Sequence, residues 1–200
     1  MRPRLTTISR TALLAIAAGL LALGYTAGGA PQDSSQIPSP ASVVKPHAYV
    51  SLEPVPRGSE FEVAVVADIA RGFHMNSHKP SDEYLIPTTL TPQLPSGFHL
   101  DETVYPSGQL LKLAFSPGKP LSVYTGSVTF RLRLSAQAGA QLGAAAIPMT
   151  LRYQACNDAA CLPPVKIPVS VSVNIAAAGT KSNPAHPEIF SAASTKNPRS

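Results

Sequence analysis

The stretch Ser127-Val-Thr-Phe-Arg-Leu-Arg-Leu134 alternates apolar and polar side chains without a break. Its four apolar residues, from Val128 to Leu134, would lie on one face of an extended strand, and the polar residues would lie on the other. A strand with one apolar face and one wet face is typical of an antiparallel sheet that packs against a second layer. This stretch therefore predicts a layered β-structure.

Similar strand patterns recur along the chain. They cover Phe61–Ala67, Leu111–Phe115, Met149–Tyr153 and Val165–Val173. Proline and glycine turn signals separate these runs, and no segment has the pattern of a capped amphipathic helix. About seven to nine short strands predict an all-β fold, an immunoglobulin-like antiparallel β-sandwich. The Cys-Trp-Cys core of immunoglobulin domains is absent, because the chain has no Trp.

The two ends of the chain have a different composition from the middle. Residues 1–30 run from arginines through an apolar stretch to small residues, which is the order of a secretory signal peptide. An uncleaved N-terminal anchor is the alternative. Residues 31–42 are expected to form a linker and residues 177–200 a disordered tail, since both are rich in Pro and small residues. The folded domain is expected over residues 43–176, in the periplasm or otherwise exported.

The formal net charge of +5 does not indicate a nucleic-acid surface. Much of the positive charge lies in the export segment and the C-terminal tail. The middle of the chain has no basic stripe interleaved with aromatic residues. We therefore expect no nucleic-acid partner, and contact with a membrane only through an uncleaved signal segment.

The chain has two cysteines, Cys156 and Cys161, between two predicted strands. Fully extended, their Cα atoms would be about 16 Å apart, whereas a disulfide requires about 7 Å or less. Asn157 and Asp158 favour the turn that would bring the cysteines together. A closed loop this short stabilises the fold by only roughly 2 kcal/mol. The spacing alone leaves a structural staple and a redox centre equally open.

A second cluster suggests a metal site as an alternative. His74, Met75 and His78 lie close together in the sequence, and imidazole and thioether groups, with the two thiols, are ligands that suit copper. In a strand, however, neighbouring side chains point to opposite faces. An exposed polar loop would explain the same residues.

Three blocks of sequence resemble the N-terminal periplasmic domain of the thiol:disulfide interchange protein DsbD. Tyr153–Pro164 is similar to the active-site hairpin of that family. Phe73–Pro87 is similar to its early strand-loop-strand, and Leu94–Pro106 to the segment that carries its cap loop. The resemblance extends over roughly residues 43–173.

The resemblance implies an immunoglobulin-like sandwich with a reversible Cys156–Cys161 disulfide, and Cys161 is expected to form the bond to a partner. It also implies a cap over the pair, formed here by residues 101–106. The best-known members have a Phe in this cap, which this chain lacks, and one more residue between the cysteines. The expected site-lining residues are Asp101, Glu102, Val104, Tyr105 and Tyr84.

These observations predict an exported thiol-disulfide exchange domain with catalytic residues Cys156 and Cys161 and no cofactor. The resemblance implies that it relays reducing equivalents from a thioredoxin-like protein or a membrane thiol transporter, in trans, to periplasmic acceptors. Cytochrome c maturation components are among the acceptors of the family. The alternatives are a non-catalytic immunoglobulin-like binding module with a structural disulfide and a copper-handling periplasmic protein.

Overall fold

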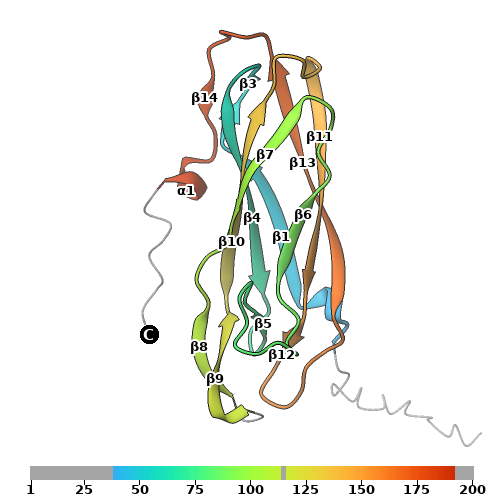
Figure 1. Ribbon diagram of the computed structural model, residues 1–200, viewed down its shortest axis with the longest axis vertical. Coiled ribbons are helices and arrows are strands. Elements are labelled where there is room, and N and C mark those ends of the chain that lie inside the picture. Colours follow the sequence, from blue (N-terminus) through green and yellow to red (C-terminus); the bar gives the residue numbers. More distant parts are fainter. Residues whose placement is uncertain (1–37, 114–115, 192–200) are drawn as a thin grey trace, which may run out of the picture. The chain divides into compact units, whose positions relative to one another are not determined.

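The computed structural model describes residues 38–113 and 116–191, which form a nearly all-β domain (Figure 1). One antiparallel sheet has the strand order β1-β4-β10-β7. Its strands are β1 (Val44–Val50), β4 (Glu60–Ile69), β10 (Ser127–Ala136) and β7 (Phe98–Val104). The predicted strands 61–67 and 127–134 are thus confirmed, and they lie next to each other at the centre of this sheet.

The second sheet has the order β3-β13-β11-β6. It consists of β3 (Val55–Pro56), β13 (Val165–Ala176), β11 (Gly143–Tyr153) and β6 (Thr89–Pro92). β11 and β13 are antiparallel partners over their full overlap, from Gly143 opposite Ile175 to Tyr153 opposite Val165. The predicted strands 149–153 and 165–173 are therefore also confirmed.

The apolar faces of these two sheets meet in one core. In β10, Phe130, Leu132 and Leu134 are fully buried, while the arginines between them lie on the outer face. β11 and β13 contribute Leu151, Tyr153, Val173 and their neighbours from the opposite sheet. The alternation in the sequence therefore becomes the inner and outer faces of a sandwich, and the predicted immunoglobulin-like antiparallel fold is confirmed.

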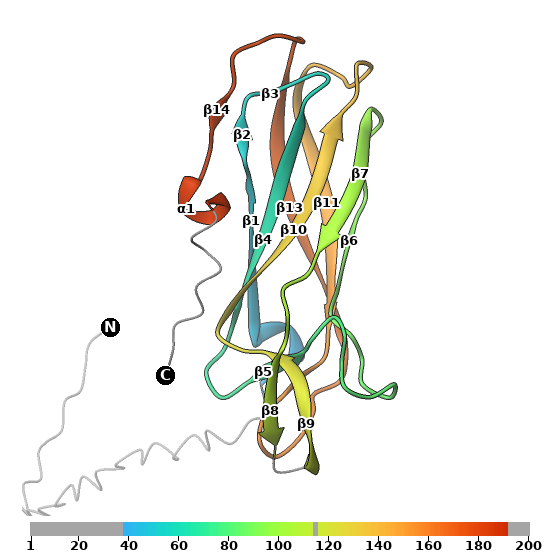
Figure 2. The same cartoon turned by 60° about the vertical axis from the view of Figure 1, so that its left-hand side comes forward.

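A third, smaller sheet lies at one end of the sandwich, as both ribbon views show (Figures 1 and 2). Its order is β12-β5-β9-β8. The strands are β12 (Ala155–Cys156), β5 (His74–Asn76), β9 (Ser116–Tyr124) and β8 (Gln109–Leu113). It has a small core of its own, made by Leu85, Leu113, Leu121 and Val123. This sheet carries the first cysteine.

The segment after β13 is not a disordered tail up to residue 191, so this prediction is wrong for residues 177–191. β14 (Asn183–Pro184) pairs with β2 (Leu52–Glu53), and α1 (Pro187–Phe190) follows. Arg131 of β10 donates hydrogen bonds to the main-chain oxygens of Ile189 at 2.8 Å and Phe190 at 3.5 Å. Side chains contribute as well: the Arg131 guanidinium lies over the Phe190 ring at 5.7 Å, and the Tyr49 and His186 rings are in edge contact. Composition does not reveal these contacts.

The domain also begins slightly earlier than expected. The short helix η1 (Pro40–Ser42) lies within the predicted linker, and the carbonyl oxygen of Pro40 accepts a hydrogen bond from the Tyr153 hydroxyl at 2.7 Å. The predicted signal peptide (residues 1–30), residues 31–37 of the predicted linker and residues 192–200 lie outside the described residues. Within the described residues, no helix has the length and apolar character needed to cross a bilayer.

Candidate functional site

The cysteine loop is the connection between the two longest strands of the second sheet. The chain leaves β11 at Tyr153 and enters β13 at Val165, and these two residues are opposite each other in the ladder. Tyr153 is fully buried and its hydroxyl is bonded to Pro40. Burial raises its pKa to about 12. Both ends of the loop are thus fixed by the sandwich.

Within the loop, Asn157 forms the turn. Its side-chain oxygen accepts hydrogen bonds from the amides of Ala159 and Ala160, each at 2.9 Å, and its own amide donates to the Ala160 oxygen at 3.0 Å. An Asn that accepts main-chain amides in this way closes a tight turn. One step further out, the amide of Leu162 donates to the oxygen of Ala155 at 2.8 Å. The loop therefore folds back as a small hairpin.

This hairpin brings the cysteines together as a disulfide. Cys156 and Cys161 are bonded, with their Cα atoms 3.9 Å apart. The two residues differ sharply in accessibility: Cys156 is 1% exposed, whereas Cys161 is exposed. A partner thiol approaching from solvent would therefore meet Cys161 first.

His74 faces the buried cysteine from the neighbouring strand. In the β12–β5 ladder the Cα partner of Cys156 is His74, and that of Ala155 is Met75. The His74 side chain is buried, with 4% of the residue exposed. Burial lowers its pKa below 6.5, and the negative charge of Asp158 in the cysteine loop partly opposes this. The imidazole is therefore neutral near pH 7.

Strand β5 is held firmly against the cysteine loop by Asn76. Its side-chain amide donates to the oxygens of Ile86 at 3.1 Å and of the Gln154 side chain at 3.3 Å. The Asn76 main-chain amide donates to the Gln154 oxygen, and its oxygen accepts from the Thr88 hydroxyl at 2.6 Å. These bonds fix the position of His74 relative to Cys156.

An open pocket of about 460 Å³ lies beside His74. Its walls include apolar side chains of β8, the turn before β5, and Asp158 of the cysteine loop. The exposed Arg71 also lines it. The lining residues are Ile69–His74, Leu111, Leu113, Thr125, Gly126 and Asp158. The pocket thus joins the neighbourhood of the disulfide to the third sheet.

The structure places the expected cap residues Asp101, Glu102 and Val104 in β7. Val104 lies opposite Arg131 of β10, and Glu102 forms an ion pair with Arg133 at 2.7 Å. β7 belongs to the first sheet, whereas β12, which carries Cys156, belongs to the third. The role of these three residues in a cap stays a prediction.

Tyr105, the next expected residue, packs inward. Its ring stacks on His78, with centroids 3.6 Å apart, and its hydroxyl accepts a hydrogen bond from the Leu90 amide at 2.9 Å. Burial raises the pKa of Tyr105, and the bond to Leu90 partly opposes this. Tyr105 thus connects the end of β7 to the segment between β5 and β6.

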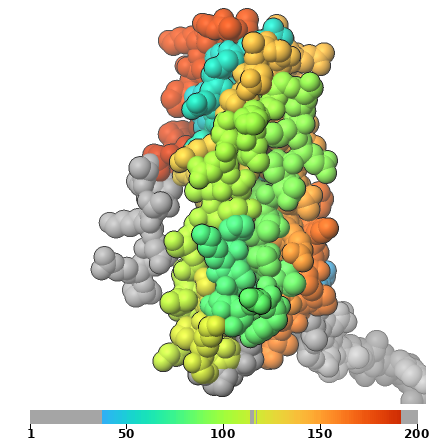
Figure 3. All heavy atoms as spheres, in the orientation of Figure 1, coloured from blue at the N-terminus to red at the C-terminus, as the bar shows by residue number. Residues whose placement is uncertain are grey.

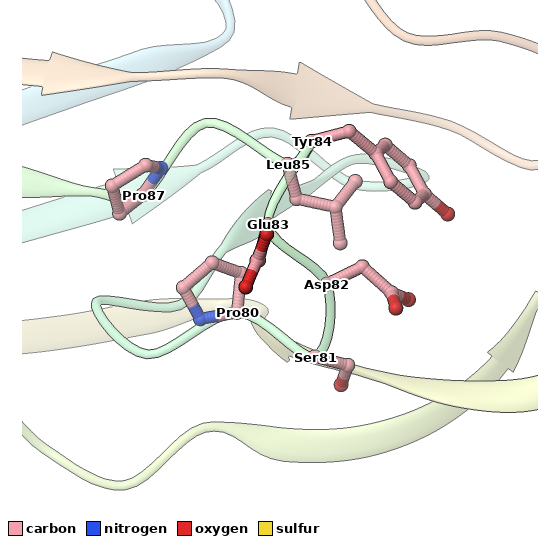
Figure 4. Close-up of a pocket in the computed structure, with 7 residues that line it drawn as sticks. All are labelled: Pro80, Ser81, Asp82, Glu83, Tyr84, Leu85 and Pro87. Carbon is pink, nitrogen blue, oxygen red and sulfur yellow. The ribbon is translucent and has the colours of Figure 1, made fainter.

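Tyr84 lies in the loop between β5 and β6 and is 74% exposed. The loop is tied to β9 by Lys119, whose ammonium group contacts the Asp82 carboxylate at 2.7 Å. In the space-filling view, this loop and the β8–β9 hairpin adjoin at the same end of the domain (Figure 3). Residues Pro80–Leu85 and Pro87 line a separate open hollow of about 740 Å³, which includes no residue of the cysteine loop (Figure 4).

The copper alternative gains no support from the geometry. Met75 is fully buried in the main core. His78 has its ring on Tyr105 and its Nδ1 atom 3.0 Å from the Thr88 oxygen. In the described part of the chain, no three His, Cys, Asp or Glu residues lie together as a metal site.

The sequence alone did not indicate that His74 lies opposite Cys156. Its spacing from Met75 and His78 suggested a metal ligand or an exposed polar loop instead. The pairing of β5 with β12 joins segments far apart in the sequence, and neither strand is longer than three residues. Such short strands give almost no periodic signal, so nothing in the spacing pointed to this contact.

A comparison with protein families gives a match over most of the chain. The family model described as "Thiol:disulfide interchange protein DsbD, N-terminal" matches residues 41–172. A comparison with curated proteins found no significant match.

Two solved structures are similar to this chain. The Neisseria meningitidis DsbD N-terminal domain in the reduced form is 19% identical, with a TM-score of 0.42; the match covers 74% of this chain and 94% of that one. The N-terminal periplasmic domain of ScsB from Proteus mirabilis is 12% identical, with a TM-score of 0.45; the match covers 69% of this chain and 49% of that one.

Proposed function

Because this chain belongs to the family of DsbD N-terminal domains, we propose that it is an exported thiol-disulfide exchange domain that uses the Cys156–Cys161 pair. It relays reducing equivalents between a thioredoxin-like protein or a membrane thiol transporter, in trans, and acceptors in the periplasm. Components of cytochrome c maturation are candidate acceptors. The exchange requires no cofactor, since the cysteines themselves carry the electrons.

The observation that carries this proposal is the unequal exposure of the two cysteines. Cys161 is exposed and Cys156 is 1% exposed. Exchange requires one sulfur that a partner can reach and a second that can leave and later return. The short turn at Asn157 keeps both cysteines in one small hairpin. A disulfide that only stapled the fold would not need one exposed member.

The proposed reaction proceeds in two displacements. A partner thiolate attacks the sulfur of Cys161, the Cys156–Cys161 bond breaks, and its electron pair stays on Cys156. The second thiol of the partner loses its proton and attacks the partner sulfur in the mixed disulfide, which releases Cys161 as a thiolate. The partner becomes a disulfide, and the domain takes up two electrons and two protons. Transfer to an acceptor is the reverse sequence.

Trapping tests this proposal. The Cys156→Ser variant, with Cys161 activated as a mixed disulfide with thionitrobenzoate, would be mixed with a reduced thioredoxin-like protein whose resolving cysteine is replaced by serine. We expect release of thionitrobenzoate and formation of a stable complex, joined by a disulfide to Cys161, that dithiothreitol separates by reduction. The Cys161→Ser variant, activated at the buried Cys156, is the matched control and should react far more slowly. Equal reaction of both variants would contradict the assigned roles.

A redox titration separates exchange from the alternative, a binding module with a structural disulfide. Exchange catalysts have potentials of about −120 to −270 mV, whereas structural disulfides lie below about −300 mV. We expect a potential in the range of the exchange catalysts. A potential in the range of structural disulfides, below about −300 mV, would favour the binding module.

A further inference from the structure

A buried cysteine that leaves as a thiolate needs help from its surroundings. When the partner attacks Cys161, a negative charge forms on Cys156, which is 1% exposed. An apolar environment disfavours a thiolate and raises the pKa of a buried thiol. The cysteine loop contains no Lys or Arg that could offset this cost. Another group must therefore act on this sulfur if exchange is to be fast.

His74 is in position to do so. Residues directly opposite each other in an antiparallel pair have Cβ atoms about 4.5–5.5 Å apart and share one face. His74 and Cys156 are such a pair, and both are buried. The other pair of this ladder, Met75 with Ala155, offers no polar side chain. A neutral imidazole has one N–H donor and one acceptor nitrogen.

The charges near His74 come from two other segments. Asp158, in the cysteine loop, is close enough to affect the imidazole, and Arg71, in the turn before β5, lines the same pocket. Neither sits opposite Cys156 in the ladder. The carboxylate of Asp158 would oppose a thiolate but favour a protonated His74, whereas Arg71 would favour the thiolate. His74 is therefore the titratable side chain that the β12–β5 ladder places opposite Cys156.

We propose that His74 is an acid–base partner of Cys156: its protonated imidazole donates a hydrogen bond and then the proton to the leaving thiolate, and the neutral imidazole takes the thiol proton back when Cys156 returns to attack. This inference rests on the proposed function. In the first displacement the electron pair of the broken bond stays on the Cys156 sulfur, which takes a proton from the His74 imidazolium and leaves the imidazole neutral. In transfer to an acceptor, the Cys156 proton moves to the neutral imidazole, the Cys156 thiolate attacks the Cys161 sulfur of the mixed disulfide, and the acceptor leaves as a thiolate that takes up a proton from His74 or from solvent.

The test measures the thiol pKa of Cys156 directly. In the Cys161→Ser background, Cys156 is the only thiol, and its ionisation is followed by thiolate absorbance against pH. We expect His74→Leu to raise this pKa by about one unit or more, which means about threefold slower reaction with oxidised glutathione below the pKa, because the tenfold smaller thiolate fraction is partly offset by higher nucleophilicity. His74→Gln keeps an N–H donor and should restore part of the loss. His47→Leu, at an exposed position of β1, should change nothing.

The outcomes are distinct. An unchanged Cys156 pKa in His74→Leu, with an unchanged glutathione rate, overturns the inference. If His74→Leu does not fold, as judged by circular dichroism, the comparison of His74→Gln with the parent decides, because a pH–rate profile identical to that of the parent also overturns it. The proposed function can fail independently: a His74-dependent pKa combined with no mixed disulfide in the trapping experiment would leave this inference standing and remove exchange with such partners.

Discussion

The rings of Tyr105 and His78 stack face to face, with their centroids 3.6 Å apart and their planes within 3° of parallel. The Tyr105 hydroxyl also accepts the Leu90 amide at 2.9 Å. These contacts join three segments: the end of β7, the loop after β5, and β6. They hold the segment that leads from β5 back to the second sheet.

We predict that Tyr105→Phe destabilises the domain by about 1 kcal/mol, because it leaves the buried Leu90 amide without this acceptor while keeping the ring stack. Tyr105→Ala removes the stack as well and should cost more, about 3 kcal/mol or above. Urea unfolding followed by circular dichroism measures both changes. Tyr84→Phe is the control, since Tyr84 is 74% exposed. A loss as large in Tyr84→Phe as in Tyr105→Phe would show that the Leu90 contact is not the cause.

Because His74 is buried, we expect the free energy of unfolding to depend on pH. Its pKa in the folded domain is lowered below 6.5, mainly by burial. Below pH 6.5 the unfolded chain therefore binds a proton that the folded chain does not bind, and the free energy of unfolding falls as the pH falls towards the folded pKa. The contribution is fully present above pH 6.5. His74 can contribute at most about 1.4 kcal/mol per pH unit to the slope of the free energy of unfolding against pH.

Denaturant unfolding between pH 7.5 and 4.5 checks this prediction on the disulfide form. His74→Leu should flatten the part of the curve just below pH 6.5. His47→Gln changes an exposed histidine and should keep the curve of the parent protein. If His74→Leu and the parent give parallel curves, another group is responsible for the pH dependence.

The sheets of the sandwich could be predicted from the sequence because their strands are long and half-buried. β10 alternates over ten residues, and its inward positions from Val128 to Leu134, such as Phe130, lie opposite buried residues of β4, such as Val65. The segment after residue 176 could not be predicted in this way. It is held by hydrogen bonds from Arg131 to the main-chain oxygens of Ile189 and Phe190, and by long-range ring contacts such as that of Arg131 with Phe190. Neither kind of contact leaves a periodic pattern in the sequence.

Only the part of the site that is formed by residues close together in the sequence could be predicted. The turn at Asn157 and the pairing of the two cysteines follow from residues within one loop. The position of His74 depends on a ladder of two residue pairs between distant segments. The sequence also did not indicate that the ring of Tyr105, expected in a cap, stacks on His78; its role in a cap stays a prediction. Contacts between short, distant segments are set by the packed fold rather than by the local pattern.

The contacts of Arg131 are expected to hold the C-terminal segment to the first sheet. Its guanidinium donates to the Ile189 and Phe190 oxygens and forms an ion pair with Glu62 at 3.2 Å, with both side chains mostly buried. Arg131→Ala should cost about 1.5–3 kcal/mol, as for hydrogen bonds to a charged group, and should make the segment from residue 182 more sensitive to proteolysis. Arg133→Ala is the matched control on the same strand.

The ion pairs of Arg133 with Glu62 and Glu102 are largely exposed, so this control should lose only about 0–1 kcal/mol. Thermal unfolding and limited proteolysis with mass spectrometry measure the two effects. Cleavage after residue 182 at the parent rate in Arg131→Ala would show that β14 and its pairing with β2, rather than Arg131, hold the segment.

The hydrogen bonds of Asn157 are expected to lower the redox potential of the disulfide. Its side-chain oxygen binds two loop amides in the hairpin that joins Cys156 and Cys161. Asn157→Ala removes these bonds and should weaken the bonded hairpin more than the open dithiol, because the open loop is less constrained. A loss of about 1 kcal/mol corresponds to a potential about 20 mV less negative. Equilibration in glutathione buffers, followed by thiol quantification, measures the shift.

The control is Ala159→Ser, which changes an exposed residue of the same loop and should leave the potential unchanged. A shift of the same size in both variants would point to general loosening of the loop rather than to the loss of the Asn157 oxygen.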